Sequence, residues 1–397
     1  MTYNFDEIIE RRHTNSIKWT AYPEDVLPMW VADMDFAVPE PIRDALHQAI
    51  ERGEFGYAFA TRKTKQIVAE RMQRLYGWSV DPDWVIETTG VVSGFNIAAR
   101  AYCRPSDGAL IQTPAYPMFY SIYKNMGLTQ QTAPLSFVNE DGVLHPQLDL
   151  DAFARSFHSN NARTRMFLLC HPYNPTGQVF SREELLRMAE TCLQNDAMII
   201  SDEIHCELLL DDAKHIPTAA LSPEIADRTI TLISPSKTFN IAGLFSAFAI
   251  ISNAEAREKF KEASEKMTGH PSSLGLIAAE TAFSGACDDW LNELRLYLAR
   301  NRNFVMEYLA ENFPQAKYTH PAATYLHWID FGEYVRTSRI VDSPFKFFLE
   351  NAKVAVNDGK PFGAGYENFI RLNFGAPRTL VEQGLSQMKR ALMPVRH

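Results

Sequence analysis

Short apolar runs alternate with segments of helical periodicity between about residues 85 and 250 of this 397-residue chain. The runs are rich in β-branched residues and show little polar alternation, which is typical of parallel strands buried on both faces. One helical segment, 181–194, begins with Ser181 and Glu184 at the spacing of a capping box. We therefore expect an α/β fold with helices on both faces of a mostly parallel sheet. The expected strands span residues 84–88, 109–113, 165–169, 197–200 and 229–233.

The pattern changes after about residue 286. A long helical pattern over 288–312 is followed by strand-like segments at 324–330 and 369–374 and by a final helix from Thr379. This order predicts a smaller α+β domain beside the larger α/β one, as expected for a chain longer than a single core usually supports. The predicted divisions are an N-terminal segment that joins the small domain (1–47), a large cofactor-binding domain (48–285) and the small C-terminal domain (286–397).

Composition narrows the classes of function. The net charge of −9 comes from dispersed acidic residues, so we expect no nucleic-acid partner. No apolar run approaches the ~18 residues of a membrane span, and the N-terminus lacks a basic start followed by an apolar core. Five widely spaced cysteines without a C-x-x-C pair indicate reduced thiols rather than disulfides or a zinc site. We expect a cytoplasmic protein with no membrane partner and no metal.

A lysine stands among small hydroxylated residues directly after the last of these apolar runs, in the segment 234–243. An amine at Lys237 can form a Schiff base with an aldehyde cofactor, and the hydroxyls of Ser234 and Ser236 can meet a phosphate on the same molecule. Such a cofactor would be pyridoxal 5′-phosphate. Taken alone, the segment also fits an exposed lysine in a Ser/Pro loop.

Two polar residues follow other expected strands. Asp202 stands after the run 198–201, where its carboxylate can pair with a pyridinium nitrogen and keep it protonated. Asn174 lies in a turn fixed by two prolines and a glycine, 171–177, where its amide can bind the phenolic oxygen of the cofactor. The alternative for Asp202 is a helix-cap or turn aspartate, and the alternative for Asn174 is a plain turn without a ligand.

The segment 89–94 joins a strand to the helical pattern 95–104. Backbone N–H groups at such a helix start, including those of Val91 and Val92, favour an anion such as phosphate. Neither G-x-G-x-x-G nor G-x-x-x-x-G-K-[ST] occurs in the chain, so a dinucleotide or nucleoside triphosphate has no support.

An aromatic residue and a strand arginine complete the candidate site. Tyr116 begins a helix and can stack on a pyridine ring, although a core tyrosine is an equal alternative. Arg371 alternates with Ile370 and Leu372 in an expected strand, where a charge needs an acidic partner. A bidentate grip on a substrate carboxylate meets that need, and so does an internal salt bridge.

These motifs occur in one order along the chain and together resemble the fold-type I pyridoxal-phosphate enzymes of the class I/II aminotransferase superfamily. Within it they are most similar to the MalY/PatB-like C–S lyases, the cystathionine β-lyase and cystalysin group. The resemblance covers nearly the whole chain and implies a seven-stranded, mostly parallel sheet in the large domain. The segments that carry it are 30–36, 56–57, 89–92, 202–205 and 236–244.

The resemblance also implies a role for each matching residue and a homodimer with active sites at the interface. Lys237 would be the Schiff-base lysine and the base, and Tyr116 and Asp202 would complete the catalytic set. Asn174 and Arg371 would bind the substrate, Arg371 through its α-carboxylate. Tyr57 would reach the phosphate in the neighbouring subunit. The implied cofactor-binding set is Tyr57, Val91, Val92, Tyr116, Asn174, Asp202, His205, Ser234, Ser236 and Lys237.

Two positions favour a lyase over an aminotransferase. Many aminotransferases carry an arginine eight residues after the lysine and a tyrosine three after the aspartate, whereas this chain has Phe245 and His205. We expect α,β-elimination of a sulfur amino acid to pyruvate, ammonia and a thiol. An aminotransferase and a regulatory protein on this fold are the alternatives. The chain departs from the lyase pattern at Ser93, where proline is common, and at His171 before Asn174.

Overall fold

The computed structural model describes residues 3–53 and 55–393 and contains a seven-stranded sheet near the middle of the chain. All neighbours in this sheet run parallel except those of β10, which is antiparallel to both β2 and β9. The expected mostly parallel, seven-stranded sheet is confirmed. Its strands, in spatial order, are β2 (Val85–Thr88), β10 (Ala247–Ile250), β9 (Thr229–Ile233), β8 (Met198–Asp202), β7 (Thr164–Cys170), β3 (Gly108–Thr113) and β4 (Thr129–Pro134).

The five predicted strands are all present, with bounds that differ by at most two residues. Every residue of β3, β8 and β9 is buried, which explains why their sequences are apolar without alternation. The predicted capping box of α7 is formed, with the Ser181 hydroxyl accepting from the Glu184 N–H and the Glu184 carboxylate accepting from the Ser181 N–H. The helix predicted at 95–104 starts earlier, at Val91, directly after Gly90.

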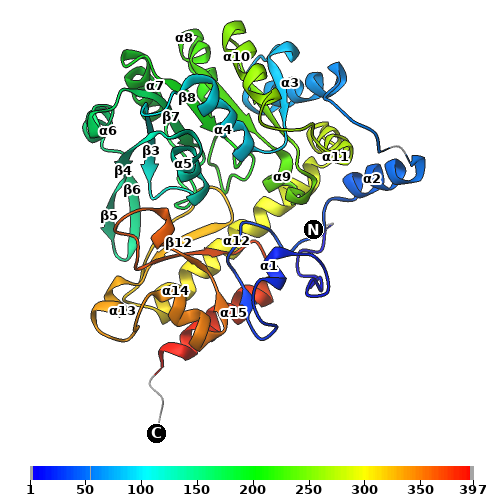
Figure 1. The fold of residues 1–397 in the computed structure, drawn as a ribbon. Helices are drawn as coiled ribbons and strands as arrows, with labels where there is room; N and C mark the ends of the chain where they lie inside the picture. The colour runs from blue at the N-terminus through cyan, green and yellow to red at the C-terminus, as the bar shows by residue number, and fades with distance from the viewer. Residues whose placement is uncertain (1–2, 54, 394–397) are drawn as a thin grey trace.

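Helices surround this sheet, and Figure 1 shows the sheet and these helices above a second layered region. α4 packs against β7, β8, β9 and β10 and is itself covered by α10. The helices are α1 (Ile17–Thr20), α2 (Glu40–Arg52), α3 (Arg62–Tyr76), α4 (Val91–Tyr102), α5 (Ser121–Met126), α6 (Leu150–Ser156), α7 (Arg182–Gln194), α8 (Pro223–Asp227), α9 (Pro235–Thr238), α10 (Ala254–Glu265), α11 (Ser273–Phe283), α12 (Asp288–Asn312), α13 (Gly332–Arg336), α14 (Pro344–Phe347) and α15 (Arg378–Leu392).

A second sheet lies beside α12 and α15 in the lower part of Figure 1. The long helix predicted over 288–312 is α12, and the two predicted late strands are β12 and β15. The N-terminal segment joins this region through a short parallel pair, β1 (Leu27–Pro28) with β13 (Val354–Ala355). The strands of the second sheet, in order, are β14 (Asn357–Asp358), β15 (Phe369–Asn373), β12 (Leu326–Asp330), β11 (Lys317–Thr319), β6 (Val143–Gln147) and β5 (Ser136–Glu140).

Three further features bear on the classes of function weighed above. All five cysteines are buried and unpaired. Among the described residues, no helix combines the length and apolar character that crossing a membrane requires. The same part of the chain contains no group of three or more His, Cys, Asp or Glu residues able to hold a metal ion.

Candidate active site

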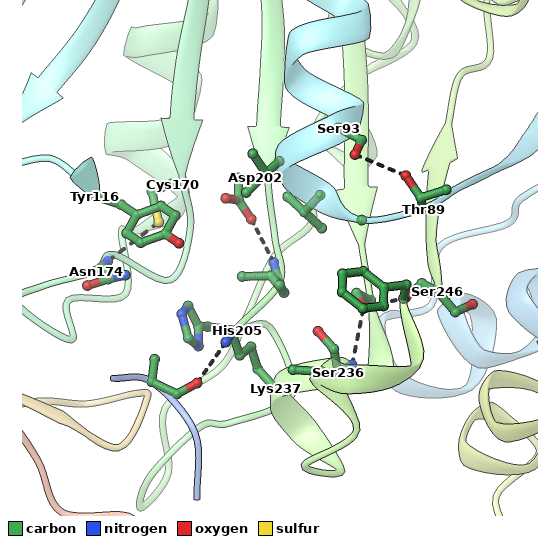
Figure 2. Close-up of a pocket in the computed structure, with 18 residues that line it drawn as sticks. Thr89, Ser93, Tyr116, Cys170, Asn174, Asp202, His205, Ser236, Lys237 and Ser246 are labelled. Atoms are coloured by element: carbon green, nitrogen blue, oxygen red, sulfur yellow. Dashed lines mark hydrogen bonds between the residues drawn. The ribbon is translucent and has the colours of Figure 1, made fainter. Parts of the chain in front are cut away.

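A cavity of about 240 Å³ lies where the carboxyl ends of β2, β9, β8 and β7 meet. In an open α/β sheet this edge is where ligands bind. Figure 2 shows side chains from all four strand ends and from the α4 start converging on it. Its lining comprises Ala32, Thr89, Gly90, Val91, Val92, Ser93, Tyr116, Cys170, Asn174, Asp202, Ile204, His205, Ser234, Ser236, Lys237, Ala242, Phe245 and Ser246. Nine of the predicted site residues are in this set, and Arg371 and Tyr57 are not.

Lys237 is placed by the short helix α9, which follows β9. The Ser234 hydroxyl caps this helix by accepting from the Ser236 N–H at 3.1 Å. The Lys237 amine points into the cavity and donates to the Ala32 carbonyl at 2.7 Å. Burial lowers the pKa of this amine to about 8, while the Asp33 carboxylate acts in the opposite direction. Lys237 is therefore a half-buried lysine whose amine loses its proton at a lower pH than an exposed lysine does, and the exposed-loop alternative is wrong.

Asp202 ends β8 and is buried at the floor of the cavity. Its Oδ1 accepts the Ile204 N–H at 3.1 Å, as expected of a turn aspartate. Burial nevertheless raises the pKa of this carboxyl to about 7. A cation placed beside it would lower that pKa and restore the carboxylate, which is what pairing with a pyridinium nitrogen provides.

Arg371 belongs to β15 of the second sheet and contacts the cavity residue Asn174 from outside the lining. It donates from Nη1 to Asn174 Oδ1 at 3.0 Å and from Nη2 to Asn357 Oδ1 at 2.6 Å. No carboxylate of a described residue pairs with it, so the salt-bridge alternative is not observed. Its Nε is buried without a hydrogen-bond partner in the described part of the chain. A buried guanidinium with a free donor is suited to an incoming carboxylate.

His205 is also buried, and its Nδ1 has no hydrogen-bond partner among the described residues. Burial, together with the positive charges of Lys237 and Arg371, lowers the pKa of this imidazole to about 3. His205 is therefore neutral at physiological pH, with a ring nitrogen available to a ligand. This lone nitrogen lies in the same cavity as Lys237.

The first turn of α4 has the properties of an anion site. Its N-cap, Gly90, has no side chain to accept from the N–H groups of the first turn, and Val91 and Val92 line the cavity. Ser93 accepts from the Thr89 hydroxyl at 3.0 Å. The hydroxyl of Ser234 donates to the Ser246 carbonyl at 2.7 Å and is thus already engaged, whereas Ser236 lines the cavity.

The two predicted aromatic residues lie in different places. Tyr116 is half-buried in the cavity, and burial raises the pKa of its hydroxyl. Tyr57 lies outside the cavity, is 101% exposed and has a ring contact with His270 at 6.3 Å between centroids. Within this single chain Tyr57 therefore has no part in the cavity.

His171, one of the departures from the lyase pattern, is not among the cavity residues. Its ring is buried and stacks on His215 at 4.5 Å, and His215 pairs with Glu203 at 2.7 Å. Sequence reasoning missed Ala32, Cys170 and Ser246 as cavity residues. The 30–36 motif could have indicated Ala32. Nothing in the sequence indicated Cys170 and Ser246, because they line the cavity through the exact bounds of β7 and β10, which only the structure defines.

The residues fit pyridoxal 5′-phosphate. The Lys237 amine, a buried carboxylate that needs a cation, an uncapped helix start and a His205 nitrogen without a partner among the described residues surround one cavity. Lys237, Asp202, Asn174, His205, Tyr116 and the α4 start would hold the cofactor, and Arg371 lies at the side of Asn174.

Comparison with known proteins gives a consistent result. The family model for aminotransferase class I and II matches residues 24–387. Cystathionine β-lyase PatB of Bacillus subtilis is 36% identical over 98% of this chain and 100% of its own. Cystalysin from Treponema denticola, solved with pyridoxal 5′-phosphate, has a TM-score of 0.91 at 31% identity, with 99% of both chains covered. The C–S lyase from Staphylococcus hominis has the same TM-score and coverage at 32% identity.

Proposed function

The chain belongs to the class I and II aminotransferase family and, within it, to the MalY/PatB-like group of pyridoxal-phosphate enzymes, and from that membership we propose that it is a carbon–sulfur β-lyase. It converts a sulfur amino acid to pyruvate, ammonia and a thiol by α,β-elimination. The observation that carries this proposal is the Lys237 amine, which points into one cavity with Asp202 and has a lowered pKa. Relatives over the full chain length are named cystathionine β-lyases.

The bound cofactor supplies an electron sink that stabilises negative charge at the substrate Cα. Lys237, freed by the incoming amino acid, takes the Cα proton, and its pKa near 8 suits this role at neutral pH. Asp202 keeps the ring nitrogen protonated, since a buried carboxylate is stable only beside a cation. As the Cβ–S bond breaks, the electron pair left at Cα would form the Cα=Cβ bond, and the thiolate would take the proton held by Lys237. Water would then hydrolyse the remaining dehydroamino acid to pyruvate and ammonia.

The substrate is oriented by Arg371 and Asn174. Arg371 presents its free Nε to the α-carboxylate, and Asn174 fixes the guanidinium through its 3.0 Å hydrogen bond. This arrangement holds the Cα–H bond toward Lys237. Tyr116 lines the cavity and would help to hold the cofactor, with its hydroxyl protonated because burial raises its pKa.

We further propose a homodimer in which Tyr57 binds the cofactor phosphate of the neighbouring subunit. The support is its full exposure within an aromatic patch, defined here as Phe55, Tyr57 and Phe59, all exposed. Large exposed aromatic groups of this kind are typical of protein interfaces. The cytoplasm is the proposed compartment, because five buried unpaired thiols suit a reducing environment.

The test is an absorbance spectrum of the purified protein before and after addition of L-cystathionine, with pyruvate and free thiol assayed in the same cuvette. A visible cofactor band with equal amounts of pyruvate and thiol supports the lyase. Amino-group transfer to a 2-oxo acid without pyruvate release would instead identify an aminotransferase. Absence of the band would mean that Lys237 has been misinterpreted.

A further inference from the structure

A second, larger space opens beside Lys237. This outer cleft has a volume of about 970 Å³ and shares Ala32, Lys237, Ala242 and Phe245 with the inner cavity. The inner cavity, at about 240 Å³, is below the roughly 300 Å³ at which small-molecule sites usually begin. With the cofactor held in the inner cavity, the outer cleft offers room for the sulfur arm of a substrate whose carboxylate is held near Arg371.

The segment 30–36 lines the outer cleft, and its Ala32 also lines the inner cavity. Hydrogen bonds to its backbone carbonyls fix this segment. From the α9 side, Asn240 Nδ2 donates to the carbonyls of Met34 and Phe36, both at 2.9 Å. From the second sheet, Asn373 Nδ2 donates to the Val31 carbonyl at 2.7 Å and the Asp33 carbonyl at 2.8 Å. These bonds hold Ala32 and Asp33 in a constant position relative to Lys237.

The two carboxylates of this segment differ in their partners. Asp35 is buried and accepts from Lys18 Nζ and Trp19 Nε1, both at 2.7 Å, so it has a structural role. The Asp33 side chain is 29% exposed and lines the outer cleft with Lys237. It pairs with Arg11 at 3.8 Å and accepts no side-chain hydrogen bond from any described residue. Apart from this long ion pair, the Asp33 carboxylate is open to the outer cleft.

We propose that Asp33 is a positioning residue that acts through Lys237, a proposal that rests on the lyase function above. After Lys237 has taken the Cα proton, the Ala32 carbonyl accepts a hydrogen bond from the resulting ammonium, and the negative charge of Asp33, which lines the same outer cleft without touching Lys237, stabilises it. The Cβ–S bond then breaks with both electrons passing to sulfur, and Lys237 returns its proton to that sulfur. The electron pair left at Cα forms the Cα=Cβ bond of a dehydroamino acid, the thiol leaves neutral and Lys237 returns to a neutral amine, so atoms and charges balance.

The charges around Lys237 agree with this role. Burial has the largest effect on the Lys237 pKa. Of the two carboxylates that raise this pKa, Asp33 has a larger effect than Asp202. Burial raises the pKa of Asp33, while Lys18 and Arg11 lower it. The charged and titratable groups that act on Asp33 are Arg11 and Lys18 from the N-terminal segment, Asp35 from its own segment and Lys237 from α9, and Asp33 in turn acts on Tyr325.

The experiment compares holoenzymes carrying Asp33→Asn, Asp33→Glu and the control Asp25→Asn. Asparagine preserves the shape of the side chain, and the hydrogen bonds from Lys18 and Asn373 go to the backbone carbonyl, so folding does not depend on the carboxylate. Asp25 is an exposed carboxylate of the same N-terminal segment that pairs with Lys353 at 3.4 Å. Two readouts are measured: the ratio of thiol release to amino-group transfer, and the pH midpoint of the visible absorbance of the holoenzyme without substrate.

We expect Asp33→Asn to lower the elimination-to-transfer ratio by about tenfold and to move the absorbance midpoint down by about one pH unit, the usual effect of one nearby charge. Asp33→Glu should recover part of both values, and Asp25→Asn should match wild type. The proposal is overturned if Asp33→Asn keeps both values, or if it raises only KM for cystathionine, which would make Asp33 a substrate-binding group. Absence of thiol release from the wild-type enzyme would instead refute the lyase function itself.

Discussion

At the residue scale, the chemistry depends on the Lys237 amine. Lys237→Ala removes the group that binds the cofactor aldehyde and takes the Cα proton, so the visible absorbance band and turnover should both be lost. The expected fall in kcat exceeds about 10²-fold, the lower limit for general acid–base catalysis alone. Lys63→Ala is the control, since Lys63 is 78% exposed and pairs only loosely with Glu280 at 3.4 Å. Retention of the band in Lys237→Ala would contradict the assignment.

Asp202 gives a pH-dependent prediction. In the cofactor-free protein its folded pKa of about 7 lies above the value of ~3.9 for an unfolded aspartate. The folded state therefore holds a proton that the unfolded chain releases, and this contribution to stability is full below about pH 4 and lost as the pH rises through about 7. Asp202→Asn should remove this loss and make the cofactor-free protein more stable than wild type at pH 8, by up to a few kcal/mol at about 1.4 kcal/mol per pKa unit.

The measurement is urea unfolding of cofactor-free wild type and Asp202→Asn at pH 5 and pH 8. The difference between the two proteins isolates Asp202 from the other titrating groups. An equal difference at both pH values would show that the Asp202 pKa is not raised. Adding the cofactor should reverse the order at pH 8, because the pyridinium then stabilises the carboxylate.

At the scale of elements, burial decides how much of the fold is predictable from the sequence. The strands β3, β7, β8 and β9 are buried on both faces, and their continuous apolar runs identify them. β4 lies at the edge of the sheet, and its TQQTAP sequence carries no such signal. Because the apolar runs identify the strands, they also mark where each strand ends, and so the site residues that follow directly, such as Asp202, were predictable. The approach of Ala32 and Asp33 to Lys237 was not, because it depends on contacts with Asn240 and Asn373 far along the chain.

The helix α3 contains a buried arginine that ties it to two other parts of the molecule. Arg71 is fully buried and donates to the carboxylates of Glu207 and Asp288. Arg71→Met would leave Glu207 buried without its partner, so the free energy of unfolding should fall by about 3–5 kcal/mol. Arg62→Met in the same helix breaks an exposed pair with Asp83 and should cost only about 0–1 kcal/mol. Urea unfolding of the two variants checks this, and equal losses would contradict it.

At the scale of the whole molecule, the domain divisions at residues 47 and 285 remain a prediction, as does the assembly. The second sheet takes β5 and β6 from the middle of the chain and β11, β12, β14 and β15 from its last third. Arg371 of β15 meets Asn174 from the end of β7, so the proposed substrate site is built from both sheets. Any relative movement of the two sheets would change the position of the Arg371 guanidinium. The geometry of the substrate site therefore depends on how the two sheets pack.

The proposed dimer predicts complementation between two inactive variants. If Tyr57 acts in the neighbouring site, Lys237→Ala and Tyr57→Ala homodimers are each impaired, but a mixed dimer has one complete site, with Lys237 from one subunit and Tyr57 from the other. Random mixing of subunits into symmetric dimers should therefore restore about a quarter of wild-type activity. The variants are unfolded, mixed, refolded and assayed for pyruvate, with separately refolded variants as controls. If Tyr57 instead served its own subunit, no mixed dimer would contain a complete site and mixing would restore nothing.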